Sequence, residues 1–195
     1  MSTPQDQDRR FLSKITEWLL ALPHDLKVLF EAKDDPNLER AARETAAGAI
    51  LYVLTPDTSS DEKFVGYAER AIIFRLALIA IAAKGGEGAP AFRERFEEYY
   101  SNLDTDMELC QRAMGDLYPW LAGKIDALHK HVLKGKKVAQ FIDDDESVEL
   151  LYDDGLAFAT DFPLDEDKLA MRLKRPETIL EPMRRKLAEE KKKLA

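Results

Sequence analysis

Two apolar stretches, AAGAILYVL at residues 46–54 and AIIFRLALIAIAA at residues 71–83, decide the fold of this 195-residue chain. The apolar residues of the first stretch are continuous, which predicts a helix segment that is buried all round. Each of the two apolar helices is expected to need burial on several sides. The second stretch spans 13 residues and contains Arg75. Because a membrane span needs about 20 apolar residues, it is interpreted as a core helix and not as a transmembrane segment.

Shorter helical patterns precede these stretches. Phe11, Ile15, Trp18, Leu19 and Leu22 follow helical spacing, and Pro23 is expected to end that helix and open a short one through Phe30. A turn at residues 34–37 then leads into a helix over residues 38–54. A loop at residues 55–60 separates that helix from the next, at residues 61–83.

The second half is more charged. Residues 84–90, KGGEGAP, are interpreted as a flexible break before an aromatic helix at residues 92–100. A long helix over residues 109–128 is expected to kink at Pro119 and to end near Gly135.

Residues 148–162 are ambiguous. Asp154-Gly155 is typical of a hairpin turn between two strands, whereas Val148, Leu151, Tyr152, Gly155, Ala159 and Phe162 share one helical face. The acidic start at residues 143–147 suits a helix N-terminus, so the helix is favoured and the hairpin stays open.

The predicted fold class is therefore all-α: a multi-helix bundle around a central apolar hairpin of helices 38–54 and 61–83, with a charged C-terminal helical extension. We expect residues 1–135 to form the bundle domain. Residues 136–195 are expected to form a charged helical segment packed on the same domain.

Composition excludes several function classes. A net charge of −8 disfavours nucleic acid as a partner, because phosphate backbones are repelled. Cys110 is the only cysteine and the N-terminus has no apolar signal core, so a cytoplasmic location is expected. Cys110 is interpreted as a packed structural thiol.

No nucleotide, nucleophile-elbow or zinc-protease motif is present, and residues 143–154 do not fit a calcium loop. All three histidines, His24, His129 and His131, are expected at the surface. The last two point apart on a helix and cannot share a metal. We therefore predict no catalytic residues, no cofactor and no metal.

Charge is segregated near the C-terminus. Residues 143–167 hold eleven acidic residues and no Lys or Arg, whereas residues 168–195 hold ten basic and four acidic residues. Such blocks either steer a partner, fold back on each other, or form solvated helix faces.

Residues 46–83 resemble the YkvA-like family, bacterial helical proteins of unknown function. In that family an apolar helix runs into a loop of the form Pro-x-Asp-Leu-Ile-Pro-Asp, and a Gly-aromatic pair and two acids then open a second apolar helix. Here Pro56 matches the first proline, Gly66 and Tyr67 match the Gly-aromatic pair, and Glu69 stands at the first acid.

The departures from the family are specific. Thr58-Ser59-Ser60-Asp61 replaces the Leu-Ile-Pro-Asp stretch, and Arg70 replaces the second acid. Pro56, Asp57, Asp61, Gly66, Tyr67 and Glu69 are thus the candidate site positions, with no assigned role. The resemblance implies a fold more than an activity.

Three functions follow as hypotheses. The favoured one is a non-enzymatic protein-interaction or regulatory module that engages an unknown protein partner through its segregated charge. A second is weak membrane-surface contact by the basic tail at residues 184–193. A third is an enzyme with an acidic site around Asp57, Asp61 and Glu69. Homo-oligomers are also compatible with the sequence.

Overall fold

A computed structural model describes residues 4–55, 63–163, 167 and 177–193. The protein is an all-α multi-helix bundle, as predicted from the sequence. In chain order its elements are α1 (Pro4–Asp34), α2 (Arg40–Leu54), α3 (Lys63–Lys84), the 3₁₀ turn η1 (Gly86–Gly88), α4 (Ala89–Arg95), α5 (Glu97–Tyr100), α6 (Leu103–Met114), η2 (Gly115–Leu117), α7 (Tyr118–Ala127), η3 (Leu128–Lys130), the strands β1 (Val132–Leu133) and β2 (Lys136–Lys137), α8 (Gln140–Asp143), α9 (Asp145–Thr160) and α11 (Glu177–Lys193).

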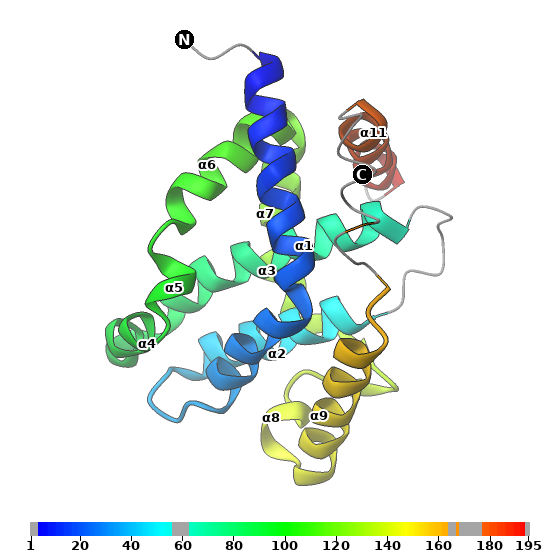
Figure 1. The fold of residues 1–195 in the computed structure, drawn as a ribbon. Helices are drawn as coiled ribbons and strands as arrows, with labels where there is room; N and C mark the ends of the chain where they lie inside the picture. Colours follow the sequence, from blue (N-terminus) through cyan, green and yellow to red (C-terminus); the bar gives the residue numbers. More distant parts are fainter. Residues whose placement is uncertain (1–3, 56–62, 164–166, 168–176, 194–195) are drawn as a thin grey trace.

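The apolar helices α2 and α3 form the centre of the bundle. α1 crosses in front of both, α6 and α7 lie toward one end of α1, and α9 and α11 lie on the other side of the molecule (Figure 1). Ile72, Phe74, Leu78 and Ile81 of α3 are fully buried, as are Ile50, Leu51 and Val53 of α2. The two stretches that are apolar in the sequence therefore supply the buried centre, although Ile79 and Ala83 near the end of α3 are exposed.

Gly48 lets another segment approach α2 closely. A Cβ atom at this position would lie 2.5 Å from the backbone oxygen of Leu128, which real contacts do not allow. The 3₁₀ turn η3 therefore packs directly on the backbone of α2.

Two helix boundaries differ from the sequence prediction. α1 continues through Pro23 and bends along its length instead of ending there (Figure 1). Proline removes one backbone hydrogen bond, but Leu22 and Leu26 on either side are buried and keep both halves on the core. The second difference is in the long helix expected over residues 109–128. This helix is interrupted at Gly115, which has φ 53°, and not at Pro119, which occupies the first turn of α7.

Residues 84–90 are not a flexible linker. Gly86 has φ 62°, and a Cβ atom at Gly88 would lie 2.2 Å from the backbone oxygen of Asn37. These glycines therefore serve a tight turn and a close approach to the α1–α2 connection. In the same way, Lys134 and Gly135 form a hairpin turn between β1 and β2 and not a helix cap.

The ambiguous segment is the helix α9, as favoured from the sequence. Its Asp144 cap accepts a hydrogen bond from the backbone N–H of Ser147 at 3.0 Å. Gly155 faces α1, where a Cβ atom would lie 2.8 Å from the ring of Phe30. The glycine that suggested a hairpin turn is therefore a contact position between helices.

The C-terminal elements contribute to the same buried core as the rest of the chain. Phe141, Leu151, Leu180, Met183 and Leu187 are buried together with the side chains of α1, α2 and α3. No helix among the described residues is long and apolar enough to cross a membrane.

Truncating Phe74, which is fully buried on α3, should destabilise the fold most directly. We expect Phe74→Ala to lower the free energy of unfolding by about 3–5 kcal/mol, measured by urea denaturation. The control Leu156→Ala changes a side chain that is 70% exposed and should stay within about 0.5 kcal/mol of the original protein. Equal effects of the two variants would place the core elsewhere.

Candidate functional site

The structure places Glu69, one of the predicted site residues, in a polar cluster between three helices. Its carboxylate on α3 accepts hydrogen bonds from the hydroxyl of Tyr52 on α2 and from the ammonium group of Lys124 on α7. Lys124 also donates to the Tyr52 oxygen at 3.1 Å. The side chain of Glu69 is only 7% exposed. The cluster therefore joins α2, α3 and α7 by charge-assisted hydrogen bonds in a largely dry environment.

Aromatic rings surround this cluster. The ammonium nitrogen of Lys124 lies 4.1 Å from the ring centre of Trp120, and His131 meets Tyr52 edge to face at 5.2 Å. Burial, followed by the charge of Lys124, lowers the pKa of His131 below its ordinary value of 6.5. His131 is thus half-buried and not on the surface as predicted, whereas His24 and His129 are exposed.

The other predicted site positions do not join Glu69. Tyr67 packs against Phe158 of α9 and against Phe162, which follows α9, with ring centres 6.2 and 5.0 Å away. Gly66 is buried within α3. Pro56, Asp57 and Asp61 lie outside the described residues. Arg70, which replaces the second acid of the family pattern, donates a hydrogen bond to the backbone oxygen of Thr55 at the end of α2.

The chemistry available to the Glu69 cluster is limited. Its carboxylate is held by a cation and a phenol, and no group of three or more His, Cys, Asp or Glu residues in the described part of the chain is placed to hold a metal ion. Cys110 is fully buried, and burial raises the pKa of its thiol to about 12. The thiol is therefore protonated at neutral pH, as the packed role predicted from the sequence requires.

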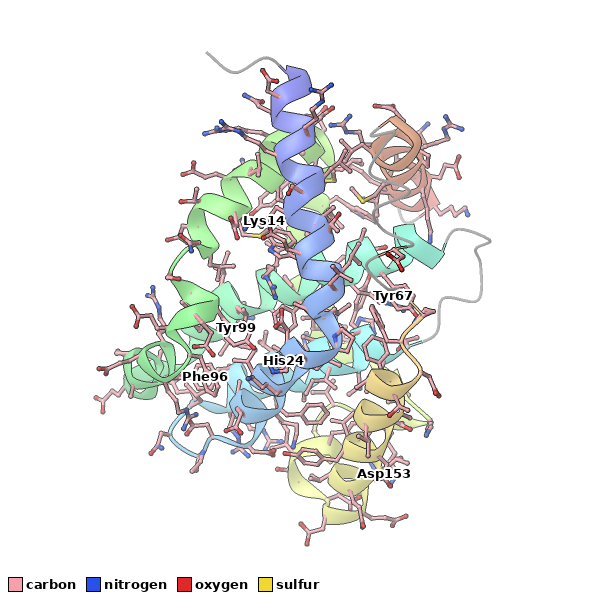
Figure 2. The ribbon with its side chains drawn as sticks, in the orientation of Figure 1. Lys14, His24, Tyr67, Phe96, Tyr99 and Asp153 are labelled. Atoms are coloured by element: carbon pink, nitrogen blue, oxygen red, sulfur yellow. The ribbon has the colours of Figure 1, made fainter. Side chains whose placement is uncertain are left out.

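A second polar feature is a groove of about 370 Å³ between α1 and the α5–α6 segment. Its lining includes a buried ion pair in which Arg75 Nη2 of α3 donates to Asp25 Oδ2 of α1 at 2.8 Å. Lys14 lies along the groove, 2.8 Å from Glu17 and 3.7 Å from Asp106. Figure 2 shows Lys14, His24 and Tyr99 around this region. Sequence reasoning noted Arg75 only as a charge in an apolar helix and missed Asp25.

The two C-terminal charge blocks do not neutralise each other within the described residues. Cations outside α11 pair with Asp143, Asp144 and Asp154. In α11, Arg184 bonds Asp8 of α1 and the backbone oxygen of Ala113. The helices α9 and α11 lie at opposite ends of the same side of the molecule (Figure 1).

The outer face of α9, formed by Asp145, Glu149, Tyr152, Asp153 and Leu156, is exposed. These residues share one side of the helix by their spacing. Leu156 is 70% exposed and Tyr152 is 46% exposed. Asp145, Glu149 and Asp153 have no ion-pair partner within the part of the chain that the structure describes. Asp153 stands on the solvent side of α9 in Figure 2.

Comparison with known proteins gives no match: no family model, no curated protein and no solved structure matches this chain. The resemblance of residues 46–83 to YkvA-like proteins therefore stays a prediction.

Removing Lys124 from the Glu69–Lys124 pair should destabilise the fold, because the Glu69 carboxylate would stay buried without its cation. We expect Lys124→Met to lower the free energy of unfolding by about 3–5 kcal/mol. The double variant Glu69→Gln with Lys124→Met should recover part of this loss, as determined by a double-mutant cycle from urea denaturation. Strictly additive effects would show that the pair is not coupled.

His131 should make stability depend on pH. Because the pKa of His131 is lowered in the folded state, the unfolded state binds a proton first as the pH falls. The contribution of His131 to the free energy of unfolding is therefore present above pH 6.5 and is lost as the pH falls further. His131→Phe keeps an aromatic edge on Tyr52 and should flatten the decline in unfolding free energy between about pH 8 and pH 5. His129→Ala, at an exposed position, should leave the decline unchanged. An NMR titration placing the His131 pKa above 6.5 would contradict this assignment.

Proposed function

We propose that this chain is a non-enzymatic protein-interaction module, whose outer face of α9 binds a basic amphipathic segment of a partner protein. The observation that carries the proposal is Leu156, a large apolar side chain 70% exposed within an acidic helix face. Tyr152 lies one turn away and extends the apolar area. A partner helix with an apolar residue opposite Leu156 and Lys or Arg beside it would complement both features.

The anchoring of α9 supports this role. Tyr152 stacks on Phe30 of α1 with ring centres 4.6 Å apart, and its hydroxyl donates to Asp34. Lys33 is fully buried and lies 5.3 Å from the same ring. The face is therefore carried on a helix that is fixed to the core, which reduces the entropy lost on binding.

The alternatives have less support. Membrane-surface contact by the basic tail would need apolar side chains facing lipid. Instead, Leu180, Met183 and Leu187 of α11 are buried against the bundle. The hypothesis of an enzyme with an acidic site at Asp57, Asp61 and Glu69 can be assessed only at Glu69, the one of these residues that the structure describes. The Glu69 carboxylate already has two hydrogen-bond partners.

The proposal is tested by comparing pull-downs from a lysate of the source organism. Leu156→Ser removes the apolar anchor, and Glu149→Lys with Asp153→Lys reverses the charge. We expect both variants to weaken capture of the same partner by about tenfold or more, because burying a leucine contributes roughly 1.5–3 kcal/mol. The purified partner should then bind the original chain more weakly as salt is raised.

A matched control keeps the number of reversed charges constant. Glu94→Lys with Glu97→Lys changes two exposed acids on α4 and α5, away from α9. It should retain the partner, and circular dichroism should show the same helicity for all variants. A partner set that is unaffected by both α9 variants would overturn the proposal.

A further inference from the structure

The groove between α1 and the α5–α6 segment has features of a built binding site. Its lining comes from three parts of the chain: α1, α3 and residues 98–106. Its volume of about 370 Å³ lies at the small end of the range of about 300–1,000 Å³ for ligand pockets. This size suits a ligand of amino-acid to dipeptide dimensions.

Arg75 is the central feature of the groove. Its side chain is 11% exposed, and its guanidinium carbon lies 4.6 Å from the ring centre of Phe74 and 5.4 Å from that of Trp18. Only Nη2 is bonded, to Asp25, within the described part of the chain. Because a guanidinium carries five N–H donors, donors remain for a ligand that enters the groove.

Carboxylates and a phenol stand near this cation. Glu98 is exposed at the groove, and Asp106 lies close enough to Arg75 to feel its charge. Burial, followed by the charge of Asp25 and a hydrogen bond to it, raises the pKa of Tyr99, so its hydroxyl is protonated at neutral pH and is directed to Asp25. The donors left for a ligand are therefore those of Arg75. Acceptors for an ammonium group and donors for a carboxylate are therefore available within one groove.

The charge balance of the lining selects the class of ligand. The permanent charges are the carboxylates of Glu17, Asp25, Glu98 and Asp106 and the cations Lys14, Lys27 and Arg75. A ligand with a strong net charge of either sign would meet several like charges as well as opposite ones. A ligand that carries both charges can place each one opposite its complement.

We propose that this groove binds a small zwitterion with the chemistry of a free amino acid or a dipeptide. Its carboxylate takes the unused guanidinium donors of Arg75, and its ammonium group takes the carboxylates that flank Arg75, with Glu98 at the open rim. The groove is separate from the outer face of α9, so this proposal is independent of the partner proposed above.

The experiment is isothermal titration calorimetry of the full chain with a panel of free L-amino acids and short dipeptides. Each member that binds is compared with its N-acetyl form, which lacks the ammonium group, and with its C-terminal amide, which lacks the carboxylate. We expect the zwitterion to bind and each capped form to bind on the order of tenfold more weakly, because each loses a charge-assisted contact.

Two variants connect binding to the groove. Arg75→Lys keeps a cation for Asp25 but removes the guanidinium fork, and it should weaken binding on the order of tenfold. Glu98→Gln removes a carboxylate proposed to bind the ammonium group of the ligand. Because Glu98 is exposed, this substitution should not disturb the core. Glu94→Gln, an exposed acid on α4 that does not line the groove, is the matched control and should bind as the original chain does.

The outcomes are decisive in both directions. Zwitterion binding that falls in both capped forms and in Glu98→Gln, but not in Glu94→Gln, supports the proposal. No binding by any panel member at millimolar concentration, equal binding of the capped forms, or binding unaffected by Glu98→Gln and by a folded Arg75→Lys variant would overturn it.

Discussion

The constraint on which the rest of the structure depends is the burial of α3 over most of its surface, although Ile79 and Ala83 near its end are exposed. A helix without a polar face must be covered by several neighbours, and α1, α2, α4, α6, α7 and α11 all contact it. Its charged side chains are then buried too, and each needs a partner. Glu69 bonds Lys124 and Tyr52, Arg70 bonds the Thr55 carbonyl, and Arg75 bonds Asp25. The polar cluster and the groove both arise from these requirements.

Hydrophobic periodicity predicted the helices whose patterns are strong, and short-range signals predicted the boundaries less well. The apolar runs of α2 and α3 and the shared face of α9 correspond to helices in the structure. Proline and glycine misled the prediction where tertiary packing decides their role. Pro23 lies inside α1 because buried residues hold both of its sides, and Gly88 and Gly155 serve close contacts instead of flexible or hairpin turns.

The candidate sites were less predictable than the fold because their partners are distant in sequence. Glu69 was singled out, but Tyr52 and Lys124 come from α2 and α7, and no local pattern connects either to it. The same holds for Asp25 and Arg75, which lie 50 residues apart. Asp25 is preceded by His24 and followed by an apolar pattern, so nothing around it indicates a buried ion pair. Only the crossing of α1 over α3 brings the two charges together (Figure 1).

The separation of the two charged C-terminal segments has an electrostatic consequence. If α11 lay against α9, its cations would cancel the acidic field of the outer face of α9. Instead, α11 turns its apolar side toward the bundle, and its Arg184 is bonded to Asp8 and the Ala113 carbonyl. The hairpin lysines pair with Asp144 and Asp154, which lie at the cap and at the side of α9, and not with Glu149 or Asp153. The outer face therefore keeps its negative potential, and within a Debye length of about 8 Å at physiological salt that potential attracts a cationic segment before contact is made.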